Sequence, residues 1–236
     1  MKPFHFQQFS VQQSGKVFRV GTDAVLLGAL CNVENSKRIL EVGSGTGIIS
    51  LMAAQRNLEV QILALDINEE AVKLTEMNFL NSPFSDRMKA ELQDFKKIET
   101  DEKYDLIISN PPYFEENSSS KDIIARQQKE LGFYELIKKA AELLTSDGLL
   151  SVIIPFESGE EFITIAEEFQ LFLHKRINIQ GAEGSKTKRL VLEFGLRKEM
   201  FTEDDFVIEK SPRKYSDQYL ELTKEFHVFS SKKLLE

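Results

Sequence analysis

The chain has 236 residues, of which 42% are hydrophobic and 29% charged, and its formal net charge is −8. This length allows one large domain or one domain with an appendage, and no apolar run approaches the ~18 residues that would cross a membrane. A single cysteine, Cys31, excludes an internal disulfide and a cysteine-based metal cluster. With no apolar signal segment after Met1, these features predict a cytoplasmic protein.

The first 37 residues form a leader in which apolar residues nearly alternate with polar ones, as at Phe4, Phe6 and Phe9. Such alternation is typical of a short strand or hairpin with one buried face, so we expect the leader to pack on the domain. A short helix over Ala24–Leu30 follows it.

From residue 38 onward, strands alternate with helices. The predicted strands are Ile39–Val42, Ile62–Asp66, Lys89–Asp94, Tyr104–Ser109, Leu149–Pro155, Phe172–Ile179 and Leu190–Leu196. The predicted helices are Thr46–Arg56, a segment capped by Asn68, Leu131–Leu144 and Glu160–Phe169. Helices between the early strands indicate right-handed crossovers and a parallel sheet. The last two strands have no helix between them, which favours an antiparallel hairpin at one end of the sheet.

The expected fold class is therefore α/β, with a seven-stranded, mostly parallel sheet, an antiparallel C-terminal hairpin and helices on both faces. We expect a single domain over residues 1–236. It consists of the leader at 1–37, a Rossmann-like core at 38–198 and a C-terminal extension at 199–236 that docks on the domain.

A glycine-rich loop follows the first core strand and opens the next helix, with glycines at Gly43, Gly45 and Gly47. Glycines allow a tight turn and let a ligand approach the backbone. Asp66, 21 residues after Gly45, ends the next strand, where a carboxylate can accept hydrogen bonds from ribose hydroxyls. The spacing departs from the G-x-G-x-x-G of dinucleotide folds. Glu41 before the loop suits a cationic ligand better than a pyrophosphate.

The third strand ends at Asp94-Phe95. Asp94 could accept a hydrogen bond from the adenine amino group of a cofactor, with Phe95 against the ring. The other interpretation of this pair is an ordinary surface turn.

The tetrapeptide Asn110-Pro111-Pro112-Tyr113 follows the fourth strand, at the sheet edge where open α/β folds bind ligands. An exocyclic adenine nitrogen is a poor nucleophile because its lone pair is delocalised into the ring. Two acceptors, the Asn110 side-chain oxygen and the Pro111 carbonyl, would favour the tetrahedral geometry needed for attack. Tyr113 could stack on the base. The other interpretation is a rigid turn that ends a strand.

These motifs resemble the class I S-adenosylmethionine-dependent methyltransferases, and more closely the bacterial tRNA(Val) adenine-N6 methyltransferases that modify position 37 beside the anticodon. The resemblance includes Arg19–Gly28, Leu40–Gly47, Ser109–Tyr113, Ala125–Arg126 and Leu190–Phe194.

The resemblance implies a methyl transfer from S-adenosylmethionine to an adenine of tRNA, with no membrane and no obligate protein partner. It implies that Asn110, Pro111, Pro112 and Tyr113 hold the target base. The implied cofactor contacts are Thr22, Asp23, Glu41, Gly43, Gly45, Gly47, Asp66, Asp94, Phe95 and Asn110. Thr22 and Asp23 would close over the methionine end, or they could simply cap the helix that follows.

Basic residues that could contact RNA phosphates are Arg126, Lys186, Lys188 and Arg189, although each could equally be a solvated surface charge. The acidic net charge leaves the RNA-binding face open. The three histidines have no metal-ligand spacing, so we expect no metal site.

Several alternative functions stay open from the sequence. A protein glutamine-N5 methyltransferase would use the same tetrapeptide on an amide nitrogen, and an rRNA guanine-N2 methyltransferase is similar. From other classes, the chain could be a nicotinamide-dependent dehydrogenase or a non-catalytic module that binds a nucleotide cofactor or RNA.

Overall fold

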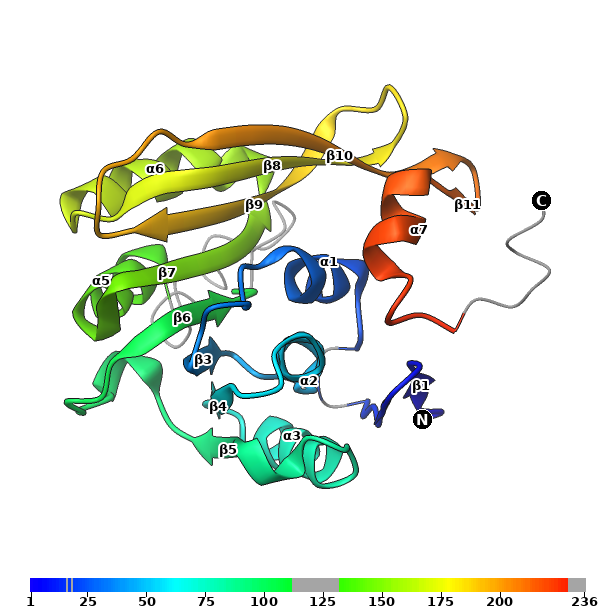
Figure 1. Cartoon of the computed structure of the whole chain (residues 1–236), viewed down its shortest axis with the longest axis horizontal. Coiled ribbons are helices and arrows are strands. Elements are labelled where there is room, and N and C mark those ends of the chain that lie inside the picture. The colour runs from blue at the N-terminus through cyan, green and yellow to red at the C-terminus, as the bar shows by residue number, and fades with distance from the viewer. Residues whose placement is uncertain (16, 18, 112–131, 229–236) are drawn as a thin grey trace, which may run out of the picture.

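The computed structural model describes residues 1–15, 17, 19–111 and 132–228, and helices cover both faces of its large central sheet (Figure 1). Nine strands form the sheet in the order β11-β10-β8-β9-β7-β6-β3-β4-β5. They are β3 (Arg38–Val42), β4 (Gln61–Asp66), β5 (Met88–Leu92), β6 (Tyr104–Ser109), β7 (Leu144–Pro155), β8 (Phe172–Ala182), β9 (Thr187–Gly195), β10 (Thr202–Ser211) and β11 (Lys214–Tyr215). The strands β3 to β7 pair in parallel, whereas β9 is antiparallel to both β7 and β8.

The helices form two layers, one on each face of the sheet (Figure 1). They are α1 (Thr22–Leu30), α2 (Ile48–Arg56), α3 (Glu69–Leu80), α5 (Phe133–Leu143), α6 (Gly159–Glu168) and α7 (Asp217–Thr223). Neighbouring strand residues point to opposite layers: Ile39 packs in the core under α1 and α2, whereas Leu40 packs in the core under α5 and α6. Burial on both faces explains why the central strands are almost wholly apolar.

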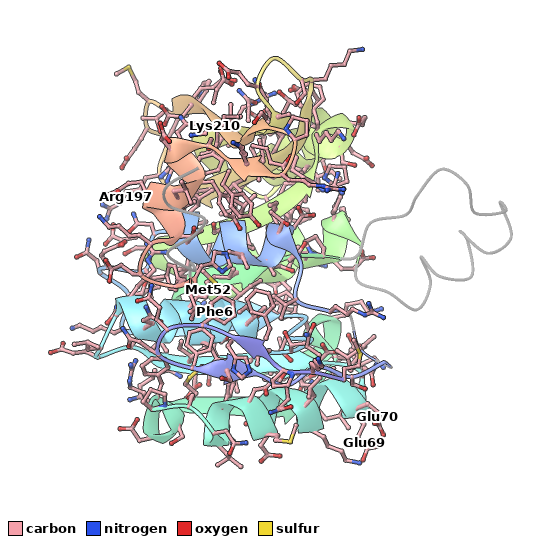
Figure 2. All side chains as sticks on the ribbon, turned by 90° about the vertical axis from the view of Figure 1, so that its right-hand side faces the viewer. Phe6, Met52, Glu69, Glu70, Arg197 and Lys210 are labelled. Carbon is pink, nitrogen blue, oxygen red and sulfur yellow. The ribbon has the colours of Figure 1, made fainter. Side chains whose placement is uncertain are left out.

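The leader forms the predicted hairpin, in which β1 (Phe4–His5) pairs with β2 (Ser10–Val11). Phe6 forms a β-bridge with His227 near the C-terminus and is only 4% exposed. Figure 2 shows Phe6 and Met52 of α2 in the interior, and both belong to the same core. The leader and the segment around His227 therefore pack together against the helical layer.

The mostly parallel sheet and its antiparallel hairpin are confirmed, but the sheet extends beyond the seven predicted strands. Part of the C-terminal extension forms β10, which pairs in parallel with β8, and β11 pairs with β10. The hairpin β8–β9 therefore lies inside the sheet and not at its end. In addition, α2 begins at Ile48 and not at Thr46, because Gly47 has a left-handed φ of 74° that a helix does not accommodate.

Across the described part of the chain, no helix is long and apolar enough to cross a membrane.

Candidate functional site: the cavity at the C-terminal ends of β3, β4 and β6

The glycine-rich loop connects β3 to α2 and is fixed to the end of β4. Gly43 N and Ser44 N each donate a hydrogen bond to Leu65 O at 2.9 Å. The φ angles of Gly43, Gly45 and Gly47 are 81°, 55° and 74°, all in the left-handed region where a side chain would be strained. The three glycines of the motif are thus required by the backbone path of the loop.

Asp66, at the C-terminal end of β4, is held in place by two backbone donors. Its Oδ2 accepts from Gly45 N and its Oδ1 accepts from Asn68 N, both at 2.9 Å. Each carboxylate oxygen keeps a second acceptor position, and the side chain lines a cavity beside the loop. The carboxylate is therefore oriented and able to accept further hydrogen bonds from a ligand.

Glu41 is the buried acid of the site, with 1% of its surface exposed. Its Oε2 accepts from Ser50 N at 3.2 Å and from Ser50 Oγ, whereas Oε1 has no hydrogen-bond partner among the described residues. Burial raises the pKa of Glu41 to about 8, because the charged form loses its hydration. A buried acceptor without a partner on a cavity wall fits a cationic ligand group such as an ammonium.

Asp94 and Phe95 lie where β5 leads into a 3-10 turn over Phe95–Lys97. Asp94 Oδ1 accepts a hydrogen bond from Lys96 N at 3.0 Å and so caps this turn. Asp94 therefore has a local structural role. Both residues line the cavity, although Phe95 is 2% exposed and packs mainly in the core under α5.

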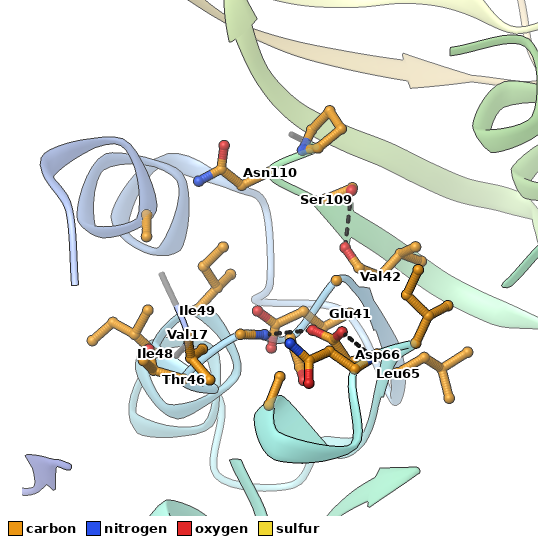
Figure 3. Close-up of a pocket in the computed structure, with 18 of the residues that line it drawn as sticks. Val17, Glu41, Val42, Thr46, Ile48, Ile49, Leu65, Asp66, Ser109 and Asn110 are labelled. Atoms are coloured by element: carbon orange, nitrogen blue, oxygen red, sulfur yellow. Dashed lines mark hydrogen bonds between the residues drawn. The ribbon is translucent and has the colours of Figure 1, made fainter. Parts of the chain in front are cut away.

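Asn110 and Pro111 follow β6 and line the same cavity as the glycine loop (Figure 3). Ser109 Oγ donates to Val42 O at 2.9 Å, which ties the end of β6 to the strand that leads into the loop. Asn110 is partly buried. The other two residues of the tetrapeptide, Pro112 and Tyr113, lie outside the described residues.

The cavity has a volume of about 1080 Å³. Nearly all of the residues predicted as cofactor contacts line it, and Gly47 is the exception. These lining residues are Thr22, Asp23, Glu41, Gly43, Gly45, Asp66, Asp94, Phe95 and Asn110. Four acidic side chains and three basic ones, Arg19, Lys96 and Arg189, make up its charged lining.

Thr22 and Asp23 are the first two residues of α1, whose N-cap is Gly21 without a side-chain cap bond. The helix therefore begins two residues before the predicted Ala24, and its N-cap is Gly21 and not Thr22 or Asp23. Asp23 Oδ2 accepts from Arg189 Nε at 2.9 Å, and both residues line the cavity. This ion pair connects the start of α1 to the start of β9 across one end of the site.

Of the residues predicted to bind RNA, only Arg189 lines the cavity among those that the structure describes. Lys186 and Lys188 lie on the β8–β9 turn and at the start of β9, next to Arg189 in the chain, and Lys188 is exposed. Arg126 lies outside the described residues.

Among the apolar residues of the cavity that were not predicted from the sequence, Ile67 is the exposed one. Ile67 follows Asp66 directly, lines the cavity and is 56% exposed. The sequence does contain a signal for this residue. It is an aliphatic side chain directly after the last residue of a strand, where no core remains to bury it. Such an exposed apolar surface beside Asp66 suits the flat face of a base.

Comparison with known proteins shows the family to which the chain belongs. Residues 12–175 match the family model of the methyltransferase small domain. A tRNA1(Val) (adenine(37)-N6)-methyltransferase from a Flavobacteriaceae bacterium is 54% identical over 97% of this chain and 100% of its own length. The chain belongs to this methyltransferase family. The family resemblance of the sequence motifs is therefore confirmed.

Two further members of the family carry the same name. The protein from Flavobacterium psychrophilum is 44% identical over 95% of this chain and 99% of its own length. The one from Bacteroides thetaiotaomicron is 36% identical over 95% of this chain and 97% of its own length.

Solved structures place the fold in the same class. A predicted O-methyltransferase from Agrobacterium tumefaciens superposes with a TM-score of 0.70 at 19% identity, covering 86% of this chain and 96% of that one. A ribosomal protein L11 methylase from Lactobacillus delbrueckii superposes with a TM-score of 0.55 at 17% identity, covering 78% of this chain and 82% of that one. The chain has the class I S-adenosylmethionine-dependent methyltransferase fold, as predicted from its motifs.

Proposed function

We propose that this protein transfers a methyl group from S-adenosylmethionine to the exocyclic N6 of an adenine in tRNA, at position 37 beside the anticodon of a valine tRNA. The proposed location is the cytoplasm. The observation that carries the proposal is that Asn110 and Pro111 line one cavity with Glu41 and Asp66, in a chain 54% identical to a relative named for this activity.

The acidic lining accounts for how the cofactor would be held. Glu41 would face its ammonium group, Asp66 its ribose hydroxyls and Asp94 the amino group of its adenine. Thr22 and Asp23 would cover the methionine end, and Gly43, Gly45 and Phe95 would shape the wall. When bound, S-adenosylmethionine supplies a methyl carbon that its positive sulfur makes electrophilic.

The tetrapeptide would hold the target amine. Asn110 Oδ1 and Pro111 O accept hydrogen bonds from the two N6 hydrogens of the adenine, which localises the nitrogen lone pair toward the cofactor side. With S-adenosylmethionine bound, these two acceptors would direct the nitrogen lone pair at its methyl group. S-adenosylhomocysteine would be the leaving group, and one N6 hydrogen would pass to water as a proton. Pro112 and Tyr113 are proposed to complete the base pocket. Positioning and preorganised dipoles then supply the catalysis, and no strong general base is needed.

The target base must leave its stack to reach this site, as in other enzymes that modify bases. The cavity volume of about 1080 Å³ slightly exceeds the ~300–1,000 Å³ of ordinary ligand sites, which supports a site for two partners. The rival acceptors, a protein glutamine and an rRNA guanine, are disfavoured because the relatives are named for a tRNA adenine activity and match over nearly their whole length.

The test is incubation of the purified protein with methyl-labelled S-adenosylmethionine and, in separate reactions, tRNA, rRNA and total protein from a strain that lacks the enzyme. Nucleoside mass spectrometry is expected to show N6-methyladenosine only with tRNA. N2-methylguanosine from rRNA or methylglutamine in protein would assign one of the rivals, and cofactor binding without any product would assign a non-catalytic module.

The lysines beside the cavity give a prediction about RNA binding. Reversing the charge of Lys186 and Lys188 is expected to weaken tRNA binding about tenfold at low salt. It should also reduce the slope of log affinity against log salt by roughly one for each phosphate that the protein no longer binds. Filter binding over a salt series measures both quantities.

A matched control reverses Lys37 and Lys198, which precede β3 and follow β9 and so lie at the opposite ends of these strands from the cavity. The control is expected to keep the wild-type slope. Equal effects of the two double variants would mean that only overall charge matters and would remove these lysines from the proposed RNA face.

A further inference from the structure

The inner face of α3 contacts the cavity wall through a buried amide, Asn78, which is 0% exposed. Its Oδ1 accepts from Gln12 N at 2.8 Å, and its Nδ2 donates to Gln12 O at 3.1 Å and to Thr46 O at 2.9 Å. One side chain thus binds the leader at Gln12, directly after β2, and the glycine loop at Thr46.

Thr75, one helical turn earlier on α3, binds the same loop at the preceding residue. It is also 0% exposed, and its Oγ1 donates to Gly45 O at 3.1 Å and lies 3.0 Å from Ser44 Oγ. The fit is close, since a Cβ on Gly47 would lie 2.9 Å from Thr75 Cγ2. Residues three apart share a helix face, so Asn78 and Thr75 form one polar contact surface.

We propose that Asn78 and Thr75 are positioning residues for the cofactor site, which fix the glycine loop and the leader in one arrangement before the cofactor binds. This inference rests on the proposed function. In this proposal, α3 is part of the cofactor site because it connects the leader to the glycine loop, two segments far apart in the sequence.

The hydrogen bonds of these two side chains support a positioning role. Each one goes to the leader or the loop, and the described apolar residues of α3, such as Leu74 and Phe79, already anchor the helix in the core. A buried amide destabilises the fold unless its groups are paired, so an apolar residue would be the ordinary choice here. Asn78 instead pairs with backbone groups of both segments.

Both bound segments continue into the cavity wall. Gly43 to Thr46 line the cavity in the loop, and Gly15, Val17 and Arg19 line it in the leader, shortly after Gln12. A loop and a leader held in the bound geometry lose less conformational entropy when the ligand arrives, which increases affinity. The expected consequence is therefore an effect on cofactor affinity, with little effect on the rate at saturating cofactor.

The test compares Asn78→Ala and Thr75→Val with the control Asn81→Ala. Asn81 lies at the C-terminal end of the same helix, and its Nδ2 donates to Met77 O at 2.8 Å, away from the loop. Calorimetric titration with S-adenosylhomocysteine is expected to give a Kd at least tenfold higher for both test variants and unchanged for the control. Thr75→Ser, which keeps the hydroxyl, is expected to restore most of the affinity.

Steady-state kinetics with tRNA separates positioning from a general loss of stability. For the test variants, KM for S-adenosylmethionine should rise at least tenfold, whereas KM for tRNA and kcat at saturating cofactor stay within about threefold of the wild type. Hydrogen exchange at the Gln12 amide should become faster in Asn78→Ala.

A lower melting temperature with an unchanged Kd, in Asn78→Ala or in the milder Thr75→Val, would overturn the proposal and leave both as ordinary core residues. The titration needs no tRNA. A failure of the proposed tRNA activity would therefore leave the Kd comparison intact and interpretable.

Discussion

Replacing Asn110 by alanine is expected to lower kcat for tRNA methylation by at least about 10²–10³-fold, the range for loss of one preorganised hydrogen-bond partner of a transition state. The reason is that the target amine keeps only the Pro111 carbonyl as an acceptor, so its lone pair stays delocalised into the ring. Single-turnover assays with saturating S-adenosylmethionine and tRNA measure the chemical step directly.

The same variant should keep most of its cofactor affinity, because Glu41, Asp66 and the glycine loop are unchanged. Calorimetric titration with S-adenosylhomocysteine is expected to give a Kd within a few-fold of the wild type, with Asn81→Ala as the control for loss of an amide elsewhere. Unchanged turnover of Asn110→Ala would place the chemistry elsewhere.

Replacing Glu41 by glutamine is expected to weaken cofactor binding roughly 10- to 100-fold, as expected for loss of a hydrogen bond to a charged partner. The carboxylate is 1% exposed and its Oε1 has no partner among the described residues, so a bound ammonium would gain a buried opposite charge. Stability without cofactor should not fall, since a neutral amide replaces a group whose charged form is costly to bury.

The pH dependence of binding tests the same group. The pKa of Glu41 is raised to about 8 by burial, so most molecules carry the proton at pH 7 and must release it before pairing with a cation. The cofactor affinity of the wild type is therefore expected to rise about tenfold per pH unit well below pH 8 and to level off as the pH approaches 8. Titrations in buffers of different ionisation enthalpy should show proton release at pH 7 that Glu41→Gln lacks.

Stability without cofactor should change with pH in the opposite direction. Because the folded pKa lies above the ordinary value of 4.5, the contribution of Glu41 is present in full below about pH 4.5 and is lost as the pH rises to about 8. The wild type should lose melting temperature relative to Glu41→Gln over this window.

Glu193 gives the matched control for both experiments. It is also buried, at 4% exposed, and burial raises its pKa, but it does not line the cavity. Glu193→Gln is expected to change the pH dependence of stability and to leave cofactor affinity and proton release unchanged. A Glu193 variant with the same binding defect as Glu41→Gln would remove Glu41 from the ammonium site.

The parallel core and the position of the site could be predicted from the order of residues alone. Strands buried on both faces, such as Leu106–Ile108 of β6, must be apolar throughout, and this run is visible without any structure. Because parallel strands end at one edge, Gly43, Asp66 and Asn110 were expected to meet there, and the cavity contains all three.

Other features have no local signal and follow only from how the elements pack. The strand β10 begins with Thr202 and continues through Glu203, Asp204 and Asp205, all exposed, and only its pairing with β8 makes it a strand. The bonds of Asn78 to Gln12 and Thr46 likewise join residues 66 and 32 positions apart. Apolar periodicity reports which face of an element is buried, whereas the partners of a strand edge or a buried amide depend on segments that are distant in the chain.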